Sequence, residues 1–411
     1  MKERMFDSRS SDAKPMHRAS YQDGCGTIHA LGTGNIMLYG RGPEWMQVIG
    51  APYSCPSVFA LVVPEGDAVQ ARSRRREGVG GWIHELPQGT LEDCASRECD
   101  CIARRWQLNE PVRFELDALD HELSDVSAPF PNATAAWLLV VRSTAAIYND
   151  YPLGNRTYML IVADGGCEAV KTQNGLFLTL KESGTMYVMG SQNYKECYAG
   201  MRKNAAMSFD VLREAADEED KVFLSRIAEC RTKLREHRLR ERVLAASEEA
   251  ALMIRAQQHL GGGVQAGHNY HLAYVRDQYG VSRGLIAAGA LNEARVILEF
   301  YREIFAKWGF IANAQAMGVD GIFHVHENDE VEITGYLLLQ AADYLKATGD
   351  EAFFRSLLPM LKWALQVQLK WLHRDMLPFN GDETYVAGWI VPRTLLEHGS
   401  FEATLLLITG G

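Results

Sequence analysis

The first two hundred residues combine short apolar runs with turn residues, whereas the second half repeats long amphipathic stretches. From about residue 22 to residue 200, Gly, Pro, Asn and Asp separate the apolar runs. This pattern predicts an antiparallel β-sandwich. The expected strands are 35–39, 46–49, 58–63, 112–116, 135–142, 157–163, 175–180 and 185–189. Within them, the run 136–141 is apolar throughout, which indicates a sheet that is covered on both faces.

Near residue 205 the composition changes to Glu, Lys, Arg, Ala and Leu, and Ser208 precedes a helical pattern. Beyond residue 240, apolar residues recur at three- and four-residue spacing, as in amphipathic helices. The predicted helices are 242–260, 275–288, 292–308, 330–347 and 351–373. We therefore expect a poorly ordered N-terminus (1–21), a β-sandwich domain (22–205), a helical linker (206–240) and a helical domain (241–411).

The connections between the predicted helices alternate in length. The short ones are 289–291 and 348–350, whereas 261–271, 321–330 and 376–385 are long and rich in Gly, His, Asn, Tyr and acidic residues. This alternation predicts helical hairpins whose long loops all lie at one rim. We expect that rim to be the functional face, because binding residues concentrate on loops that a rigid scaffold holds.

Charge and cysteine usage narrow the class of protein. The net charge of -10 and the pI near 5.7 argue against a nucleic-acid-binding protein. The eight cysteines form no CxxC pair, and Cys94, Cys99 and Cys101 lack a nearby histidine to complete a zinc set. The first residues contain no apolar h-region and no apolar run reaches membrane-spanning length, so we expect neither export nor membrane insertion. We therefore expect a reduced, cytoplasmic protein without a metal, a cofactor, a nucleic-acid partner or a membrane partner.

The basic run Arg72-Ser-Arg-Arg-Arg76 lies outside the predicted helices and precedes several glycines. We expect it to be a solvated hairpin tip rather than a site for a phosphate or another polyanion.

Two adjacent carboxylates, Asp382 and Glu383, lie in a loop between two apolar helical segments. Pro378 cannot continue the preceding helix and Gly381 permits unusual backbone angles, so both acids should project from an ordered turn. A carboxylate that a loop holds between rigid helices is suited to general acid catalysis. The alternative interpretation is an acidic loop that is only hydrated.

A second candidate group, Tyr274, Arg276 and Asp277, opens a predicted helix directly after the glycine-rich loop 261–271. Arg beside Asp at a helix start can offer a charged donor fork and a carboxylate to one hydroxylated ligand. The two side chains could equally form an internal ion pair that fixes the start of the helix.

The loop 321–330 contains His324, His326, Asp329 and Glu330. These residues could ligate a metal, line a sugar site or, in the case of one acid, cap the next helix. Aromatic residues in and beside the long loops can stack on the apolar faces of sugar rings. They are Tyr270, Tyr274, Tyr279, Phe323, Phe379, Tyr385 and Trp389.

In chain order, these groups resemble the six-hairpin (α/α)6 glycoside hydrolases, and most nearly the glucoamylase-like members. The resemblance rests on Tyr274-x-Arg276-Asp277, on Asp329 at a helix start, on Thr348-Gly-Asp350 and on the acidic loop. It implies an N-terminal β-sandwich, a helical linker and a toroid of helical hairpins. It further implies that Arg276 and Asp277 hold the hydroxyls of the nonreducing sugar. Tyr274, Asp329, Glu330 and Trp389 would complete the sugar site, and Glu383, with Asp382 as the second choice, would be the general acid.

The sequence departs from the family pattern in three places. The acidic loop reads Asn-Gly-Asp-Glu over 380–383 rather than Trp followed by two acids, and Asn328 stands where an Arg is often found. The family's general base lies in the latter half of the barrel, and the sequence ends at Gly411, shortly after the sixth barrel-type helix begins. We therefore expect 241–411 to be an incomplete (α/α)6 catalytic domain of a glycosidase fragment.

The first functional hypothesis is an inverting hydrolase of α-glucan-like oligosaccharides or polysaccharides, with a carbohydrate as the expected partner. One alternative is a disaccharide phosphorylase on the same toroid. Another is a polysaccharide lyase that uses Tyr and His residues of the kind found over 268–271. The last alternative is a noncatalytic carbohydrate-binding module.

Overall fold

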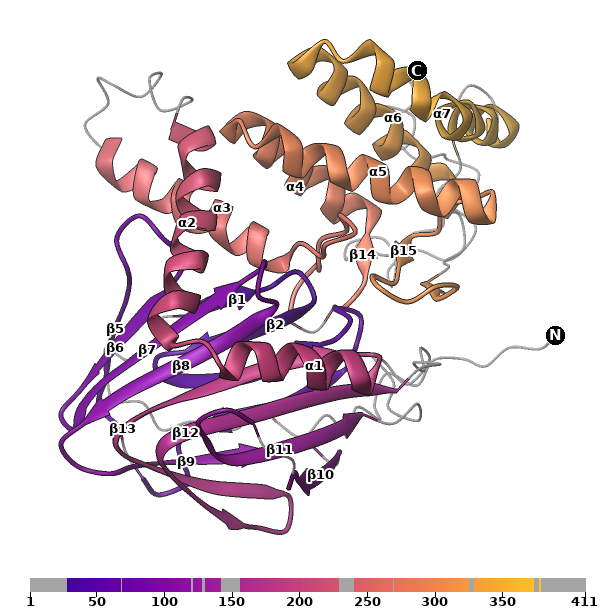
Figure 1. The fold of residues 1–411 in the computed structure, drawn as a ribbon. Coiled ribbons are helices and arrows are strands. Elements are labelled where there is room, and N and C mark those ends of the chain that lie inside the picture. The colour runs from indigo at the N-terminus through magenta and orange to yellow at the C-terminus, as the bar shows by residue number, and fades with distance from the viewer. Residues whose placement is uncertain are drawn as a thin grey trace.

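The computed structural model describes a β domain that is followed by helices (Figure 1). The described residues are 28–67, 69–119, 121–127, 130–141, 156–228, 240–268, 270–324, 329–372 and 377. The expected order of an antiparallel β domain and then helices is confirmed. The expected N-terminal segment 1–21 lies outside the described residues.

Within the described residues, thirteen antiparallel strands form one continuous hydrogen-bonded sheet. The strand order is β1-β2-β3-β4-β9-β13-β8-β7-β6-β5, and β10, β11 and β12 join it through the pairing of β12 with β13. The strands are β1 (Ile28–Gly32), β2 (Ile36–Arg41), β3 (Glu44–Gly50), β4 (Ser57–Val62), β5 (Arg72–Arg75), β6 (Trp82–Leu86), β7 (Gly89–Ser96), β8 (Cys101–Leu108), β9 (Val112–Asp117), β10 (Glu122–Asp125), β11 (Ala133–Val141), β12 (Thr157–Lys171) and β13 (Gly175–Ser191).

The sheet folds over on itself, so that strands from its two ends face each other. The Trp45 indole of β3 donates a hydrogen bond to the Asp93 carboxylate of β7 at 2.9 Å. The His29 ring of β1, at one end of the order, stacks on the Trp82 ring of β6, the last strand but one at the other end, with ring centroids 4.8 Å apart. These strands are not neighbours in the sheet, so the contacts cross the apolar core between two facing layers.

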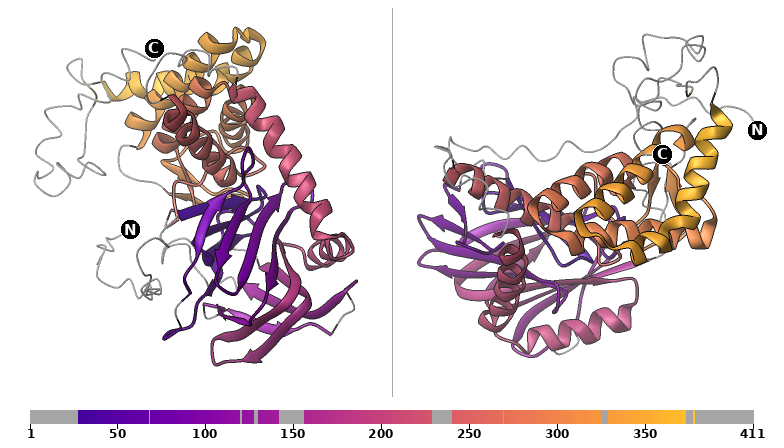
Figure 2. Two further views of the ribbon diagram at one scale, coloured as in Figure 1. Left: turned by 90° about the vertical axis from the view of Figure 1, so that its left-hand side faces the viewer. Right: turned by 90° about the horizontal axis from the view of Figure 1, so that it is seen from above.

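Two helices cover and extend the sheet. Helix α1 (Tyr194–Ala205) lies across one face of the sheet and buries Cys197 and Met201 against it (Figure 1). Helix α2 (Phe209–Ala228) then runs from the sheet toward the helical domain, where α3 (Arg240–Gln257) follows (Figure 2). The apolar periodicity alone missed α1, whose start is fixed by the Asn193 side chain, which accepts a hydrogen bond from the Lys195 amide.

The basic run 72–76 lies on and just after the edge strand β5, and the expectation of a solvated hairpin tip was wrong for its last two residues. Arg72 and Arg74 are exposed, whereas Arg75 and Arg76 face α2 and α3. Both terminal nitrogens of Arg76 donate to the Asp217 carboxylate of α2 at 2.7 Å, and Arg75 pairs with Glu248 of α3 at 3.2 Å. All four side chains are largely shielded from solvent, because the charges compensate one another between the sheet and the two helices.

The remaining described helices form two helical hairpins. The first is α4 (Val275–Ala288) with α5 (Leu291–Trp308), and the second is α6 (Asp329–Thr348) with α7 (Glu351–Trp371). Each hairpin turns at a glycine with positive φ, +85° at Gly289 and +67° at Gly349, where a side chain would be strained. The four predicted helices are thus confirmed to within two residues at each end. Among the described helices, none is both long and apolar enough to span a membrane.

Helices α4 and α6 run side by side in the same direction. Arg276 of α4 contacts Glu332 of α6, and about one turn further along both helices the Tyr279 ring lies against the Tyr336 ring at 5.2 Å. Because the contacts advance together along both sequences, the helices are parallel and begin at the same rim. The long connections 261–271 and 321–330 lead to these two helix starts, in agreement with the expected loop face.

Candidate functional site

A small sheet, β14-β15-β16, lies at the rim where α4 begins. Its strands are β14 (Ala273–Tyr274), β15 (Ala314–Gln315) and β16 (Phe323–His324), and the register places Tyr274, Ala314 and His324 in one row. Residues in one row point to the same face, and Ala314 contributes only a methyl group. The outer two side chains therefore meet above it, with the Tyr274 hydroxyl 3.2 Å from Nδ1 of His324.

The first turn of α4 presents a guanidinium and a carboxylate. Arg276 Nη1 donates to Oε1 of Glu332 in the first turn of α6 at 3.1 Å. The two side chains are 39% and 28% exposed, so a ligand from solvent can reach the pair. Asp277 is also exposed, and it lies where the dipole of α4 favours a negative charge. The arrangement thus offers both donors and acceptors to a hydroxylated ligand.

Aromatic rings lie on and next to the small sheet that precedes α4. Tyr270 is 50% exposed, and its ring is perpendicular to that of Tyr274 at a centroid distance of 6.1 Å. On β16, Phe323 contacts the rings of Trp308 and Phe310 at 5.4 Å and 5.0 Å. The rim therefore combines apolar ring faces with charged groups, which is the combination that sugar recognition needs.

Of the residues that the sequence singled out, the described structure brings together Tyr274, Arg276 and Asp277 at the start of α4. Asp329 and Glu330 are the first two residues of α6. The predicted site residues Asp382, Glu383 and Trp389, and His326 of the possible metal pair, lie outside the described residues.

Sequence reasoning missed Glu332, and it considered His324 only as a metal ligand or a loop-lining residue. The signal for Glu332 was its spacing of three residues from Asp329 on a predicted helix, since residues at this spacing share one face. His324 instead contacts the hydroxyl of Tyr274. This contact depends on the strand register, which the sequence did not reveal.

One group of potential metal ligands exists among the described residues, in the core of the β domain. Ligand atoms of His29, His84 and Asp93 all lie within 4.8 Å of one another, and the three residues are buried. However, both oxygens of Asp93 accept hydrogen bonds from Arg104 at 2.7 Å. Burial by itself would raise the pKa of Asp93, but Arg104 and His84 hold it well below its usual range. A buried guanidinium on the same carboxylate disfavours a second cation, so the group is an internal ion pair rather than a metal site.

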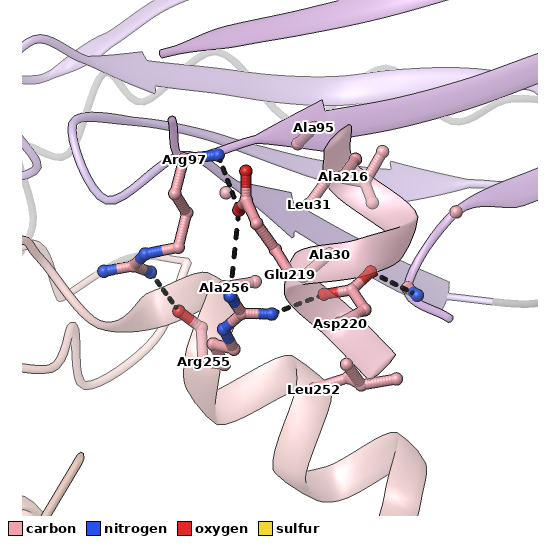
Figure 3. Close-up of a pocket in the computed structure, with 13 residues that line it drawn as sticks. Ala30, Leu31, Ala95, Arg97, Ala216, Glu219, Asp220, Leu252, Arg255 and Ala256 are labelled. Atoms are coloured by element: carbon pink, nitrogen blue, oxygen red, sulfur yellow. Dashed lines mark hydrogen bonds and ion pairs between the residues drawn. The ribbon is translucent and has the colours of Figure 1, made fainter. Parts of the chain in front are cut away.

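A cleft lies where α2 and α3 meet the sheet (Figure 3). Asp220 of α2 accepts hydrogen bonds from the Gly80 amide at 2.7 Å and from Arg255 of α3. Its neighbour Glu219 accepts from the Arg97 amide at 2.9 Å. Burial raises the pKa of Asp220 to about 6, and Arg255 opposes this rise. Because its charges pair with one another across three elements, the cleft is a joint between the sheet and the linker helices.

No protein-family profile and no curated protein matches the sequence. The fold is similar to a bacterial glucoamylase solved in complex with acarbose, with a TM-score of 0.50 and 8% identity over 88% of this chain and 69% of that chain. It is also similar to a protein from the human microbiome described as a kojibiose phosphorylase, with a TM-score of 0.50 and 8% identity over 86% of this chain. The match spans 57% of that second protein. At such low identity, the likeness establishes a shared fold.

Proposed function

We propose that this chain cleaves glycosidic bonds in α-glucan-like oligosaccharides and binds the sugar at the rim where α4 and α6 begin. The meeting of Arg276 and Glu332 beside Tyr274 is the observation that carries the proposal. Both proteins of similar fold have names that describe enzymes acting on carbohydrates, which supports the same class of substrate here.

The described side chains have the chemistry that a sugar requires. Arg276 can donate to ring hydroxyls through its planar fork, and the carboxylates of Glu332 and Asp277 can accept from them. The half-exposed Tyr270 offers its ring face to the apolar C–H side of a pyranose, and Tyr274, which is only 8% exposed, packs against the Tyr270 ring. We infer that this group holds the terminal sugar and that bond cleavage occurs next to it.

The acid chemistry is assigned from the sequence resemblance. Glu383 would protonate the oxygen of the leaving group, and Asp382 is the second choice. An inverting hydrolase also needs a second carboxylate that activates water from the opposite face, at about 6.5–9.5 Å from the acid. Asp382 and Glu383 cannot fill both roles, because neighbouring side chains diverge. Activity of this chain therefore requires Asp277, Asp329 or Glu330 as the second carboxylate.

A phosphorylase is the second candidate, because the kojibiose phosphorylase shares the fold at the same TM-score as the glucoamylase. In that reaction, inorganic phosphate replaces water as the nucleophile. The guanidinium of Arg276 at the rim suits a phosphate as well as a sugar hydroxyl. The two candidates therefore share the sugar site and differ in the attacking group.

Product analysis separates these candidates. The full chain would be incubated with maltose, kojibiose and maltooligosaccharides, with and without inorganic phosphate, and anomeric protons would be followed by NMR. An inverting hydrolase releases β-glucose under both conditions, whereas a phosphorylase forms a sugar 1-phosphate only when phosphate is present. We expect Glu383→Gln to lose several orders of magnitude in rate and Asp382→Asn to retain most of it. Absence of any product from the wild type, or full activity of Glu383→Gln, would contradict the proposal.

A further inference from the structure

One buried segment of the β domain, residues 51–55, packs against the helical domain. This segment connects β3 to β4, and Tyr53, Ser54 and Cys55 are fully buried in it. The Tyr53 hydroxyl accepts from the Gly34 amide of the β domain at 3.0 Å and donates to the Ala256 carbonyl of α3. The segment is thus anchored in both parts of the molecule.

Ser54 contacts one end of the strand pair β14–β15, which carries Tyr274. Its hydroxyl donates to the His271 carbonyl at 2.6 Å and accepts from the Met317 amide at 2.8 Å. His271 lies just before β14, and Met317 lies just after β15. A single hydroxyl of the β domain therefore joins the two chain segments that flank this pair of strands.

Neighbouring contacts reinforce the same joint. Nδ1 of the buried His271 ring lies 2.7 Å from the Cys55 carbonyl, and the Gln192 amide group donates to the Gly318 carbonyl at 2.7 Å. A β-carbon built on Gly318 would approach the Pro52 ring to 2.4 Å, so the two backbones pack closely here. The β domain therefore contacts the segments before β14 and after β15 through side chains and through backbone packing.

The two halves of the candidate sugar site consequently have different supports. Tyr274 ends the strand β14, whose flanks are bonded to the β domain, and it directly precedes α4, whose packing on α6 holds Arg276. The position of the Tyr274 ring relative to the Arg276 guanidinium then depends on the joint at Ser54.

We propose that Ser54 is a positioning residue of the sugar site: its hydroxyl fixes β14 and β15 from the β domain and so places Tyr274 beside Arg276. The consequence for sugar binding rests on the proposed function, whereas the consequence for the strands does not. Loss of the hydroxyl leaves a buried amide and a buried carbonyl without their partner, which weakens the local structure.

The first measurement is hydrogen–deuterium exchange of the full chain, read by mass spectrometry over 270–275 and 314–318. We expect exchange in these peptides to be at least about tenfold faster in Ser54→Ala than in the wild type, since one lost buried hydrogen bond is worth about that factor. Ser54→Thr retains a hydroxyl and should restore slow exchange. The matched control is Ser73→Ala, whose lost hydroxyl contacts His84 inside the β domain at 2.8 Å. It should leave both peptides unchanged.

The second measurement is the affinity for acarbose by titration calorimetry. We expect binding by Ser54→Ala to be several-fold weaker, binding by Ser54→Thr to recover, and binding by Ser73→Ala to match the wild type. Unchanged exchange over 270–275 and 314–318 in Ser54→Ala overturns the proposal. If the wild type binds acarbose, an equal affinity of Ser54→Ala for acarbose also overturns it. If the wild type does not bind acarbose, the expected exchange result still supports the role of Ser54 in fixing the strands, and the failure belongs to the proposed function.

Discussion

Arg276 at the start of α4 and Glu332 at the start of α6 are 56 residues apart in sequence, and their Nη1 and Oε1 atoms are 3.1 Å apart. The contact exists because the two helices are parallel neighbours, which brings the ends of two long connections to one rim. Both side chains are partly exposed, and ion pairs of this kind contribute little to stability. The pair is therefore a weak contributor to stability, and its role in binding a sugar is the proposal tested below.

The folded state should depend much more strongly on the buried pair of Asp93 with Arg104 than on the exposed pair of Arg276 with Glu332. Both side chains are fully buried, and two hydrogen bonds of 2.7 Å join them. We expect Asp93→Asn to lower the free energy of unfolding by about 3–5 kcal/mol, because it leaves the buried guanidinium uncompensated. Urea unfolding followed by circular dichroism measures this loss. Glu351→Gln is the control, since it removes a partner from a highly exposed pair with Arg355, and it should cause no measurable change.

The joint between the β domain and α2 gives a second prediction on stability. Arg76 makes a two-pronged contact with Asp217 and is 21% exposed, whereas Arg74 in the same run pairs with Glu85 at the surface and is 51% exposed. We expect Arg76→Lys to lower the free energy of unfolding by about 1–2 kcal/mol, because an ammonium cannot reproduce the planar fork. Arg74→Lys should have no measurable effect. Equal effects of the two substitutions in urea unfolding would show that the joint does not depend on the Arg76 fork.

This basic run shows what the apolar pattern could not predict. The strands from β5 to β8 contain Arg, Glu, Asp and His at positions that face other parts of the molecule, so they lack the apolar runs by which strands were recognised. The apparent gap between the predicted strands 175–180 and 185–189 has a related cause. Both belong to β13, which pairs with β9 over 175–180 and with β8 over 183–188, and polar residues occupy the place where the partner changes.

Burial of the His259 ring lowers its pKa to about 4, and the charge of Arg97 adds to this effect. The ring accepts a hydrogen bond from the Gly261 amide at 2.9 Å, as a neutral imidazole can. The unfolded chain takes up this proton near pH 6.5, whereas the folded chain does so only near pH 4, so the folded state loses stability as pH falls through this window. Between pH 7 and pH 4.5, we expect the free energy of unfolding to fall by about 1–3 kcal/mol less in His259→Gln than in the wild type. Urea unfolding at pH 7 and pH 4.5 measures it, and an identical pH dependence of variant and wild type would refute the assignment.

The helical half was more predictable than the contacts within it. Helices α4, α5 and α7 each have one strong amphipathic face, whereas α6 is buried almost continuously over 333–341, and apolar residues at helical spacing located all four. The same reasoning identified Tyr274, Arg276 and Asp277 as candidates, because they stand together at a helix start. It could not identify Glu332 as the partner of Arg276, or Ser54 as a support of β14. Those contacts join residues that are distant in sequence, and they depend on how α4 and α6 pack and on where the β domain meets the rim.

The central claim is that the rim at the start of α4 binds a sugar through Arg276. The most direct measurement is a calorimetric titration of acarbose into the wild type, Arg276→Met and Arg295→Met. Arg295 is a matched control, because it is 37% exposed and pairs with Asp350 at 2.7 Å near the start of α5, which begins at the other rim. We predict binding by the wild type, affinity at least about tenfold weaker in Arg276→Met, and affinity within about twofold of the wild type in Arg295→Met. Equal affinity of Arg276→Met and the wild type, or no binding by the wild type, would contradict the account.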